Sequence, residues 1–415
     1  MLYKYFLLCL AVPLVLTPIV ISLIGGQVEN NPAIYNSDAC FSIIQLSDTQ
    51  YLSWSNPSLY YATTEWIVNN SQSYNIEMVV HTGDLVDTPT HTSEWEVANS
   101  AMMTLLNNSI PYCWDAGNHD QLPPNETANL WLGDSNTDWL GSQYPAFNQT
   151  SMEREPYWVS DVCDGKNTAV TISYGNYRFL IINLEFLANS SALNWMQNLI
   201  EANPSANVIV ATHDYLNRTG GYGTRSISND GVLDYTWGSN FNATLNQYPN
   251  IFLTLSGHIL SRTTGAYNQR VGNREEVFFN RQEINGRLGA AAVRIYSFNL
   301  TDMQVDVSTY ALDNQTWLTD SYNQFSFPIS LISSMQPTGS LSGTFNPTSA
   351  TLPSRTSNPT LTVAPAPTVS PQTSPKPTMA VPENTRFGLE VFVICITSLV
   401  LSWKCISRKH RLSGF

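Results

Sequence analysis

The sequence predicts an α/β domain with a parallel sheet, and two observations support that prediction. Five apolar runs of strand length are each followed at once by a short polar signature: Phe41–Ser47, Met78–Thr82, Ile110–Ala116, Val208–Thr212 and Ile251–Ser256. A stretch with helical spacing lies between the first two runs, and this strand–helix–strand order is typical of a parallel sheet. Because groups at the carboxyl ends of parallel strands meet at one edge of a sheet, the five signatures are expected to lie in one crevice.

Apolar periodicity places helices between the predicted strands. Apolar residues recur at helical spacing in Tyr60–Asn70, Ser93–Leu106 and Ala192–Ala202. Ser93 and Glu96 have the spacing of a capping box, which predicts that the second helix begins there. Each of these helices precedes one of the predicted strands.

The remaining folded segments are an irregular stretch, a hairpin and a set of later strands. Residues 121–168 lack clear periodicity and directly follow Gly117–Asp120, so we expect them to form one wall of the crevice. Their aromatic side chains form either a small core or a binding surface. Gly175-Asn176 predicts a hairpin between Ala169–Tyr174 and Tyr177–Leu184. A second sheet packed against the first is expected from three later runs: Glu276–Phe279, Ala291–Phe298 and Met303–Thr309.

The polar signatures contain the side chains that bind transition metals. They are Asp48-Thr49-Gln50, Gly83-Asp84-Leu85-Val86-Asp87, Gly117-Asn118-His119-Asp120, His213-Asp214 and Gly257-His258. Carboxylate, amide and imidazole groups suit Zn, Mn or Fe. Taken singly, an Asp before a turn is usually a helix cap and a His at a strand end is usually a surface residue. Their repeated position after strands instead predicts a metal site, with the glycines allowing sharp backbone turns.

The order of these signatures resembles that of the calcineurin-like metallophosphoesterases, whose pattern runs D-x-H, G-D, G-N-H, H and G-H-x-H. The resemblance covers roughly residues 40–330. It implies a four-layer α/β/β/α sandwich of the metallophosphoesterase type and hydrolysis of phosphate mono- or diesters. Two positions depart from the pattern, because Gln50 and Leu260 stand where the family has His.

The resemblance also implies how the ligands are divided between two metals. Asp84 would bridge both ions, Asn118, His213 and His258 would complete one site, and Asp48 with the Gln50 amide oxygen would remain for the other. Both departures fall on this second site. Since an amide oxygen is a weaker ligand than imidazole and Leu is none, we expect one tight and one weaker divalent cation, among Mn, Zn and Fe.

Two further residues receive roles from the resemblance. His119 would contact the phosphate or protonate the leaving oxygen, and Asp87 would orient His119. In the purple acid phosphatase branch the offset of Asp87 carries a ligating Tyr, so Asp87 is alternatively a metal ligand.

Composition limits the partners of the protein. The chain has 415 residues, 43% of them hydrophobic, and a net charge of −13. This content suffices for a large core. An acidic chain with few Lys residues between its ends offers little surface for a phosphate backbone, so nucleic acid is not an expected partner.

The two ends of the chain predict export and a membrane anchor. Residues 1–26 contain a long apolar run, which predicts either a cleaved signal or an uncleaved anchor. Residues 387–403 form a second apolar run that is followed by the basic tail 404–415. Basic flanks stay cytoplasmic, so the run predicts a single transmembrane helix with the 38–330 domain outside the cell membrane. An interfacial helix is the alternative.

Other features agree with an exported domain. Residues 336–384 are rich in Pro, Thr and Ser, which predicts an extended stalk. Sequons for N-glycosylation begin at Asn69, Asn107, Asn125, Asn148, Asn189, Asn217, Asn242, Asn299 and Asn314. The cysteines between the apolar ends are Cys40, Cys113 and Cys163, which permit one disulfide, although Cys113 is expected to be a buried small residue.

Two alternatives to an enzyme remain open from the sequence. Leu260 motivates a catalytically degenerate surface protein that keeps one metal site and binds a phosphorylated or glycan ligand. The other alternative is a structural surface protein in which the metal only stabilises the fold.

Overall fold

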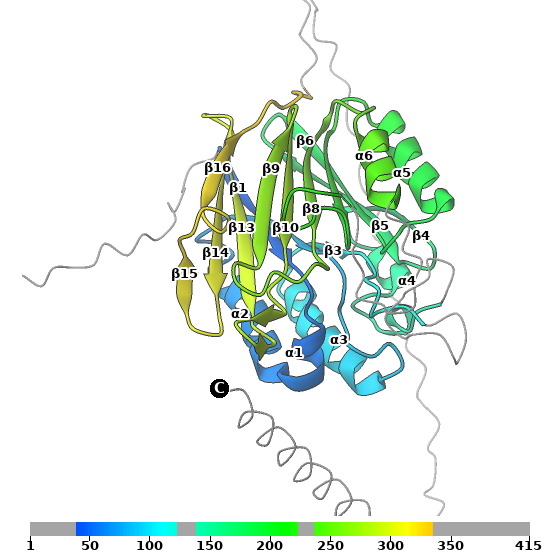
Figure 1. Cartoon of the computed structure of the whole chain (residues 1–415). Coiled ribbons are helices and arrows are strands. Elements are labelled where there is room, and N and C mark those ends of the chain that lie inside the picture. Colours follow the sequence, from blue (N-terminus) through cyan, green and yellow to red (C-terminus); the bar gives the residue numbers. More distant parts are fainter. Residues whose placement is uncertain (1–38, 123–137, 223–235, 335–415) are drawn as a thin grey trace, which may run out of the picture. The chain divides into compact units, whose positions relative to one another are not determined.

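The computed structural model describes residues 39–122, 138–222 and 236–334, which form two seven-stranded sheets flanked by helices (Figure 1). The first sheet has the order β15 (Thr316–Leu318), β14 (Gln304–Ala311), β13 (Ala292–Asn299), β1 (Cys40–Leu46), β2 (Ile76–His81) and β3 (Tyr112–Trp114), and β16 (Phe325–Pro328) also pairs with β14. The second has the order β4 (Trp158–Val162), β5 (Asn167–Tyr174), β6 (Tyr177–Leu184), β7 (Asn207–Thr212), β8 (Ile251–Ser256), β10 (Arg274–Phe279) and β9 (Ala266–Val271). A small hairpin consists of β11 (Glu283–Ile284) and β12 (Arg287–Leu288).

The helices complete a four-layer sandwich. Helices α1 (Gln50–Ser55), α2 (Pro57–Asn70) and α3 (Thr92–Asn107) lie on the side of the first sheet, and buried residues of α2 and α3 share its core. Helices α5 (Ser190–Ala202) and α6 (Thr236–Leu245) pack on the second sheet through a separate apolar cluster. The predicted α/β/β/α architecture is therefore confirmed.

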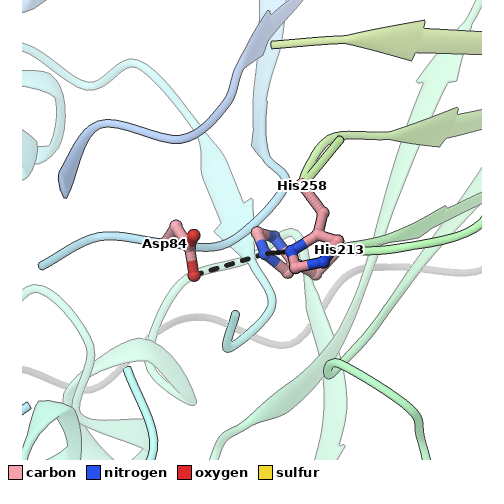
Figure 2. A group of neighbouring side chains, drawn as sticks. All are labelled: Asp84, His213 and His258. Atoms are coloured by element: carbon pink, nitrogen blue, oxygen red, sulfur yellow. Dashed lines mark hydrogen bonds and ion pairs between the residues drawn. The ribbon is translucent and has the colours of Figure 1, made fainter. Parts of the chain in front are cut away.

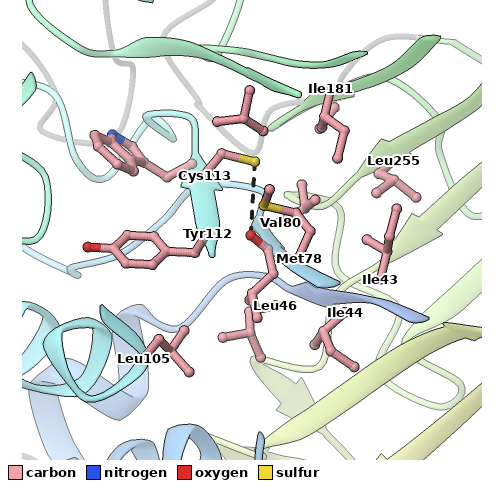
Figure 3. Packing of buried hydrophobic residues seen from close by; sticks show 14 of the residues in the cluster. Ile43, Ile44, Leu46, Met78, Val80, Leu105, Tyr112, Cys113, Ile181 and Leu255 are labelled. Atoms are coloured by element: carbon pink, nitrogen blue, oxygen red, sulfur yellow. Dashed lines mark hydrogen bonds between the residues drawn. The ribbon is translucent and has the colours of Figure 1, made fainter. Parts of the chain in front are cut away.

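Aromatic side chains hold the inner faces of the two sheets together. Phe41 of β1 stacks on Phe298 of β13 with ring centroids 4.6 Å apart. Phe298 in turn contacts Phe179 of β6 at 5.7 Å, and Phe179 contacts Phe252 of β8 at 6.1 Å. Figure 3 shows aliphatic members of the same cluster from both sheets. Since burying one such ring contributes about 1.5–3 kcal/mol, this layer fixes the sheets face to face.

The strands that carry the signatures are divided between the two sheets. Strands β1, β2 and β3 are parallel neighbours in the first sheet, whereas β6, β7, β8 and β10 are parallel neighbours in the second. The expectation that the signature strands share one sheet edge is thus wrong. The signatures still meet, because the carboxyl ends of the parallel strands in both sheets lie at the same edge of the sandwich.

The later strands also join differently from the prediction. Strand β10 belongs to the second sheet, but β13 extends the first sheet antiparallel to β1, and β14 pairs antiparallel with β13. Periodicity cannot reveal this arrangement, because strand partners are set by contacts between distant segments. The predicted hairpin is confirmed, with Tyr174 of β5 paired to Tyr177 of β6.

The start of α3 shows a second departure from prediction. The helix begins at Thr92 after His91, so Ser93 lies inside it and no capping box forms. The Glu94 carboxylate instead accepts hydrogen bonds from the backbone amides of Asp87 at 2.8 Å and Thr88 at 2.9 Å.

The irregular stretch is partly a small aromatic core. Its described part contains the short helices η1 (Gly141–Gln143) and α4 (Gln149–Met152). Trp139 and Phe147 are buried against Trp95 of α3, with ring centroids 5.6 and 6.0 Å from it. These rings are therefore core residues, and residues 123–137 of the stretch lie outside the described residues.

The predicted export segment, stalk, C-terminal apolar run and basic tail all lie outside the described residues. Within residues 39–122, 138–222 and 236–334, no helix has the length and apolar character needed to cross a bilayer. Cys113 is buried in β3 as expected, and its thiol lies 3.3 Å from Asn183 Oδ1.

Candidate metal centre

Three predicted ligands follow strand ends in a left-handed backbone conformation. Asp48 follows β1 with φ of 52°, Asp84 follows β2 with φ of 53°, and His258 follows β8 with φ of 64°. Such a conformation costs a residue other than Gly of the order of 1–3 kcal/mol and persists where the surroundings determine it, often at functional sites. The fold thus holds these three side chains in place at some cost.

Four potential ligand atoms lie close together beyond the strand ends, and Figure 2 draws three of the four side chains, Asp84, His213 and His258. His213 Nε2 lies 3.2 Å from Asp84 Oδ1, 3.0 Å from Asn118 Oδ1 and 3.1 Å from His258 Nδ1. Atoms that bind one cation at about 2.1 Å are separated by about 3.0–3.4 Å. Asp84, Asn118 and His258 therefore each lie at ligand spacing from His213, and the structure brings together all four residues predicted for the first metal.

Hydrogen bonding fixes which nitrogen of His213 faces this point. Its Nδ1 lies 2.8 Å from the carbonyl oxygen of Thr82, which can only accept, so Nδ1 carries the proton and donates it. Metal-binding His residues are commonly oriented in this way. The ring of Phe186 lies beside both imidazoles, with centroids 5.9 Å from His213 and 5.1 Å from His258. This ring shields one side of the cluster from water.

The pKa values of the His213 and His258 imidazoles are shifted in opposite directions. Burial, reinforced by the nearby His213, lowers the pKa of His258 to about 3, so the ring is uncharged at neutral pH and has one nitrogen lone pair to offer a cation. Burial also disfavours a charged His213, but the Asp84 carboxylate raises the pKa of His213 well above its ordinary value. A cation that binds His213 would displace that proton.

Asp84 directs its two carboxylate oxygens toward different groups. Oδ1 faces His213, whereas Oδ2 accepts a hydrogen bond of 2.9 Å from Gln50 Nε2. The other amide atom, Gln50 Oε1, is buried without a hydrogen-bond partner. The Asp84 carboxylate thus lies between the imidazole cluster on one side and Gln50 on the other.

Asp48 adds a second buried carboxylate beside Asp84. Its Oδ1 accepts from Asn280 Nδ2 at 2.9 Å, both of its oxygens lie 3.1 Å from the His258 amide, and Ser47 Oγ donates to Oδ2. Burial and then repulsion from Asp84 raise the pKa of Asp48 to about 8. A divalent cation would relieve both effects, so the donor set fits a metal.

His119 and Asp87 form a separate pair next to the cluster. His119 Nδ1 donates to the backbone carbonyl of Asp87 at 2.8 Å and lies 3.5 Å from its carboxylate. The backbone amide of His119 donates to Asp84 Oδ1 at 3.0 Å. The structure therefore places Asp87 at the His119 ring, and the cluster of possible ligands consists of Asp84, His213 and His258 without Asp87 among the described residues.

A comparison with protein families agrees with this geometry. The model of the calcineurin-like phosphoesterase family matches residues 41–262, more than half of the chain. The chain belongs to the calcineurin-like phosphoesterase family. Membership confirms the predicted family of the domain, a family of phosphoesterases that typically require divalent metals.

Individual relatives of the phosphoesterase are distant. The uncharacterized protein YvnB of Bacillus subtilis (strain 168) is 25% identical over 302 residues, a match that covers 70% of this chain and only 22% of the length of YvnB. Among solved structures, GAP50, the anchor in the inner membrane complex of Plasmodium, has a TM-score of 0.38 at 9% identity over 71% of this chain and 89% of its own. TT1561 of Thermus thermophilus has a TM-score of 0.35 at 9% identity over 67% of this chain and 97% of its own.

A buried carboxylate supports the loops of the phosphoesterase site. Asp120 Oδ1 accepts from the amides of Leu85 at 2.7 Å and Val86 at 3.0 Å, and Oδ2 accepts from Gly117 at 2.7 Å. Asp120 therefore ties the loop after β2 to the loop after β3. Its place in the signature was visible in the sequence, but this role was not predicted.

The glycines of the signatures serve two purposes. Gly83 has a φ of +76°, which fits the predicted sharp turn. Gly117 and Gly257 have no positive φ; instead, a side chain at Gly117 would collide with Asp84, and one at Gly257 would collide with Ser47 and Asp48. The prediction that these two glycines are needed for turning is wrong, since they are needed for close approach.

Two residues of the site were missed by the sequence analysis. Asn280 contacts Asp48, and Gln282 Oε1 accepts a hydrogen bond from Gln50 Nε2. Both follow β10 directly, in the same strand-then-polar pattern as the five signatures. The signal was therefore present, but the strand before it was assigned to a different part of the fold.

Proposed function

We propose that the domain hydrolyses phosphate mono- or diesters with two divalent cations, and that it does so outside the cytoplasm. The observation that carries the proposal is the carboxylate of Asp84, whose Oδ1 faces His213 at 3.2 Å and whose Oδ2 faces Gln50 at 2.9 Å. A carboxylate with partners on both sides is suited to bridge two ions. The family membership of the domain supports the same chemistry.

The residues of the site would bind two different ions. Asn118, His213 and His258 would hold one ion with Asp84, and Asp48 and Gln50 would contribute to the other. When bound, such cations screen the negative phosphoryl group and lower the pKa of a bound water. Phe186 excludes water from one side of the imidazoles, which strengthens every charge interaction in the cluster.

His119 is the residue that we propose to handle a proton at the leaving oxygen. Its Nδ1–H is engaged by Asp87, so Nε2 is the ring atom that can accept or give a proton toward substrate. The side chain is 16% exposed, whereas that of His213 is fully buried. Asp87 acts as a positioning residue for this ring.

The proposed location rests on the ends of the chain and on the sequons. An apolar segment at each end, with the basic tail after the second, would anchor the domain to the outer face of the cell membrane. Three of the sequon residues in the folded domain, Asn69, Asn107 and Asn314, have exposed side chains. They are therefore accessible for glycosylation in an exported protein.

A second function is favoured by one observation, the Leu at position 260. Leu260 cannot bind a cation, and it stands where the family pattern has its last His. A domain with one filled metal site could bind a phosphorylated ligand without turnover.

Hydrolysis by the purified protein separates these functions. We expect an aryl phosphate monoester or its diester to be hydrolysed, the activity to be lost with a chelator, and Mn or Zn to restore it. Binding of a phosphorylated ligand without turnover at any Mn or Zn concentration would instead support the surface binding protein.

A further inference from the structure

The segment after β10 enters the site although it belongs to none of the five signatures. Strand β10 runs parallel to β8, so its carboxyl end lies at the same edge as His258. The backbone amide of Asn280 donates to Gly265 O at 2.8 Å, and the carbonyl of Gln282 accepts from the Gly289 amide at 2.8 Å. The Gln282 amide donates to Asn280 Oδ1, also at 2.8 Å. The segment is therefore fixed on both sides.

Its two amide side chains reach residues of the proposed second metal site, Asn280 the Asp48 carboxylate and Gln282 the Gln50 amide. Asn280 Nδ2 donates to Asp48 Oδ1 at 2.9 Å. Gln282, which is 8% exposed, directs Oε1 at Gln50 Nε2, and this same Nε2 donates to Asp84 Oδ2 at 2.9 Å. Two acceptor oxygens thus converge on one amide nitrogen.

The convergence has the character of a cation site. Oxygens of Asp84 and Gln282 that meet at one positively polarised N–H2 group can also meet at a cation. Gln50 Oε1 is buried without a partner, an arrangement that ordinarily costs about 1–3 kcal/mol. A half-turn about the last single bond of Gln50 exchanges its oxygen and nitrogen, which places Oε1 beside the other two oxygens.

We propose that Gln282 is a ligand of the second cation, together with Gln50, Asp84 and Asp48, and that Asn280 positions Asp48. The inference deepens the two-cation site of the proposed function and rests on it. Gln282 stands in for the imidazole that the chain lacks at Leu260. The resulting site contains only oxygen ligands, so it selects Mn or Mg, whereas the imidazole site also accepts Zn.

The proposal is tested by counting and characterising bound metal in the full chain. Metal-stripped protein is titrated with Mn by calorimetry, and the paramagnetic resonance spectrum is recorded at two equivalents, where neighbouring Mn ions give a spin-coupled signal. We expect Gln282→Ala to weaken the second equivalent by at least about tenfold and to remove the coupled signal, with the first equivalent unchanged. Gln282→Glu is expected to tighten the second equivalent, because a carboxylate binds Mn more strongly than an amide.

A matched control and a metal competition complete the test. Gln304 lies on β14, where its amide donates to Asp306 Oδ1 at 2.8 Å, so Gln304→Ala should bind Mn as the unaltered chain does. With Zn and Mn supplied together, the unaltered chain should retain one Zn and one Mn. A second Mn equivalent of unaltered affinity in Gln282→Ala, or no tightening in a folded Gln282→Glu, would overturn the proposal.

The outcomes also separate this inference from the proposed function. If the unaltered protein bound two Mn ions through Gln282 but hydrolysed no phosphate ester, the proposed function would fail and the inference would stand. If Gln282→Ala kept both ions and full hydrolysis, the inference would fail and the function would stand.

Discussion

The imidazoles of His119 and His213 differ in their burial and in how many of their ring nitrogens have a described partner. His213 is fully buried and has both nitrogens engaged, one by the Thr82 carbonyl and one by the ligand cluster. His119 has one nitrogen at Asp87 and is partly exposed. The first arrangement suits a metal ligand and the second suits a group that meets substrate.

This difference predicts distinct effects of two substitutions. His119→Ala should lower kcat by about 10²–10⁴-fold with metal content unchanged, because it removes only proton transfer. His213→Ala should lose the tightly bound metal first. His91, whose side chain is 57% exposed and contacts Glu94, provides the control, and His91→Ala should change neither quantity.

Metal content by mass spectrometry and kcat for an aryl phosphate, measured on the same samples, check this prediction. Equal metal loss in His119→Ala and His213→Ala would remove His119 from its proposed role and make it a ligand.

At the scale of elements, local sequence pattern predicted the strand ends well. Strand β8 has the predicted bounds, and the signatures after β1, β2, β3, β7 and β8 all reach the site. The pattern succeeded because a buried strand followed by polar residues is a local feature. The division of these strands between two sheets was not predictable in the same way, since pairing depends on contacts such as Cys40 with Asn299, far apart in the chain.

The role of Gln282 was missed for the same reason, namely that strand pairing depends on contacts between distant segments. Its strand was recognised, but only the parallel pairing of β10 with β8 brings the end of β10 to the site. The sequence alone offered Asp87 as the replacement for a missing imidazole. The structure instead places Asp87 at His119 and Gln282 at Gln50.

The close approach at Gly257 predicts a measurable cost of adding one methyl group. Its Cβ would collide with Ser47 and Asp48, so Gly257→Ala should destabilise the fold by about 1–3 kcal/mol and weaken the second metal through Asp48. Gly272 serves as the control, because it has open space around it and a φ of 61° that Asn tolerates.

Denaturant unfolding of Gly257→Ala and Gly272→Asn tests this point. We expect a lower free energy of unfolding only in the first. Equal stability of both variants and the unaltered chain would show that the loop around Asp48 can relax, and that the close approach is not required.

At the scale of the whole molecule, the described site residues all lie within one folded domain. The site residues extend from Asp48 to Gln282, and the first sheet is completed by β16, where Phe327 is buried. Ser334 still contacts the domain through the carbonyl of Asn176 at 2.8 Å. Contacts with the folded domain therefore extend at least to Ser334.

A chain of residues 27–335, made in an exporting host, should therefore fold and bind metal without either apolar end. A chain of residues 27–320 lacks β16 and should be less stable, since burial of one Phe side chain contributes about 1.5–3 kcal/mol. Thermal melting and metal content of both chains are the measurements. A soluble full chain beside an insoluble or metal-free 27–335 chain would show that these boundaries are wrong.

The central claim is that phosphate-ester hydrolysis requires the two cations bridged by Asp84. The most direct test is the hydrolysis rate of an aryl phosphate measured against the number of Mn ions bound per chain, starting from metal-stripped protein. We predict no activity without metal, one tight equivalent with little activity, and a steep rise as the weaker second equivalent binds. Full activity in the stripped protein, or none with two ions bound, would contradict the account.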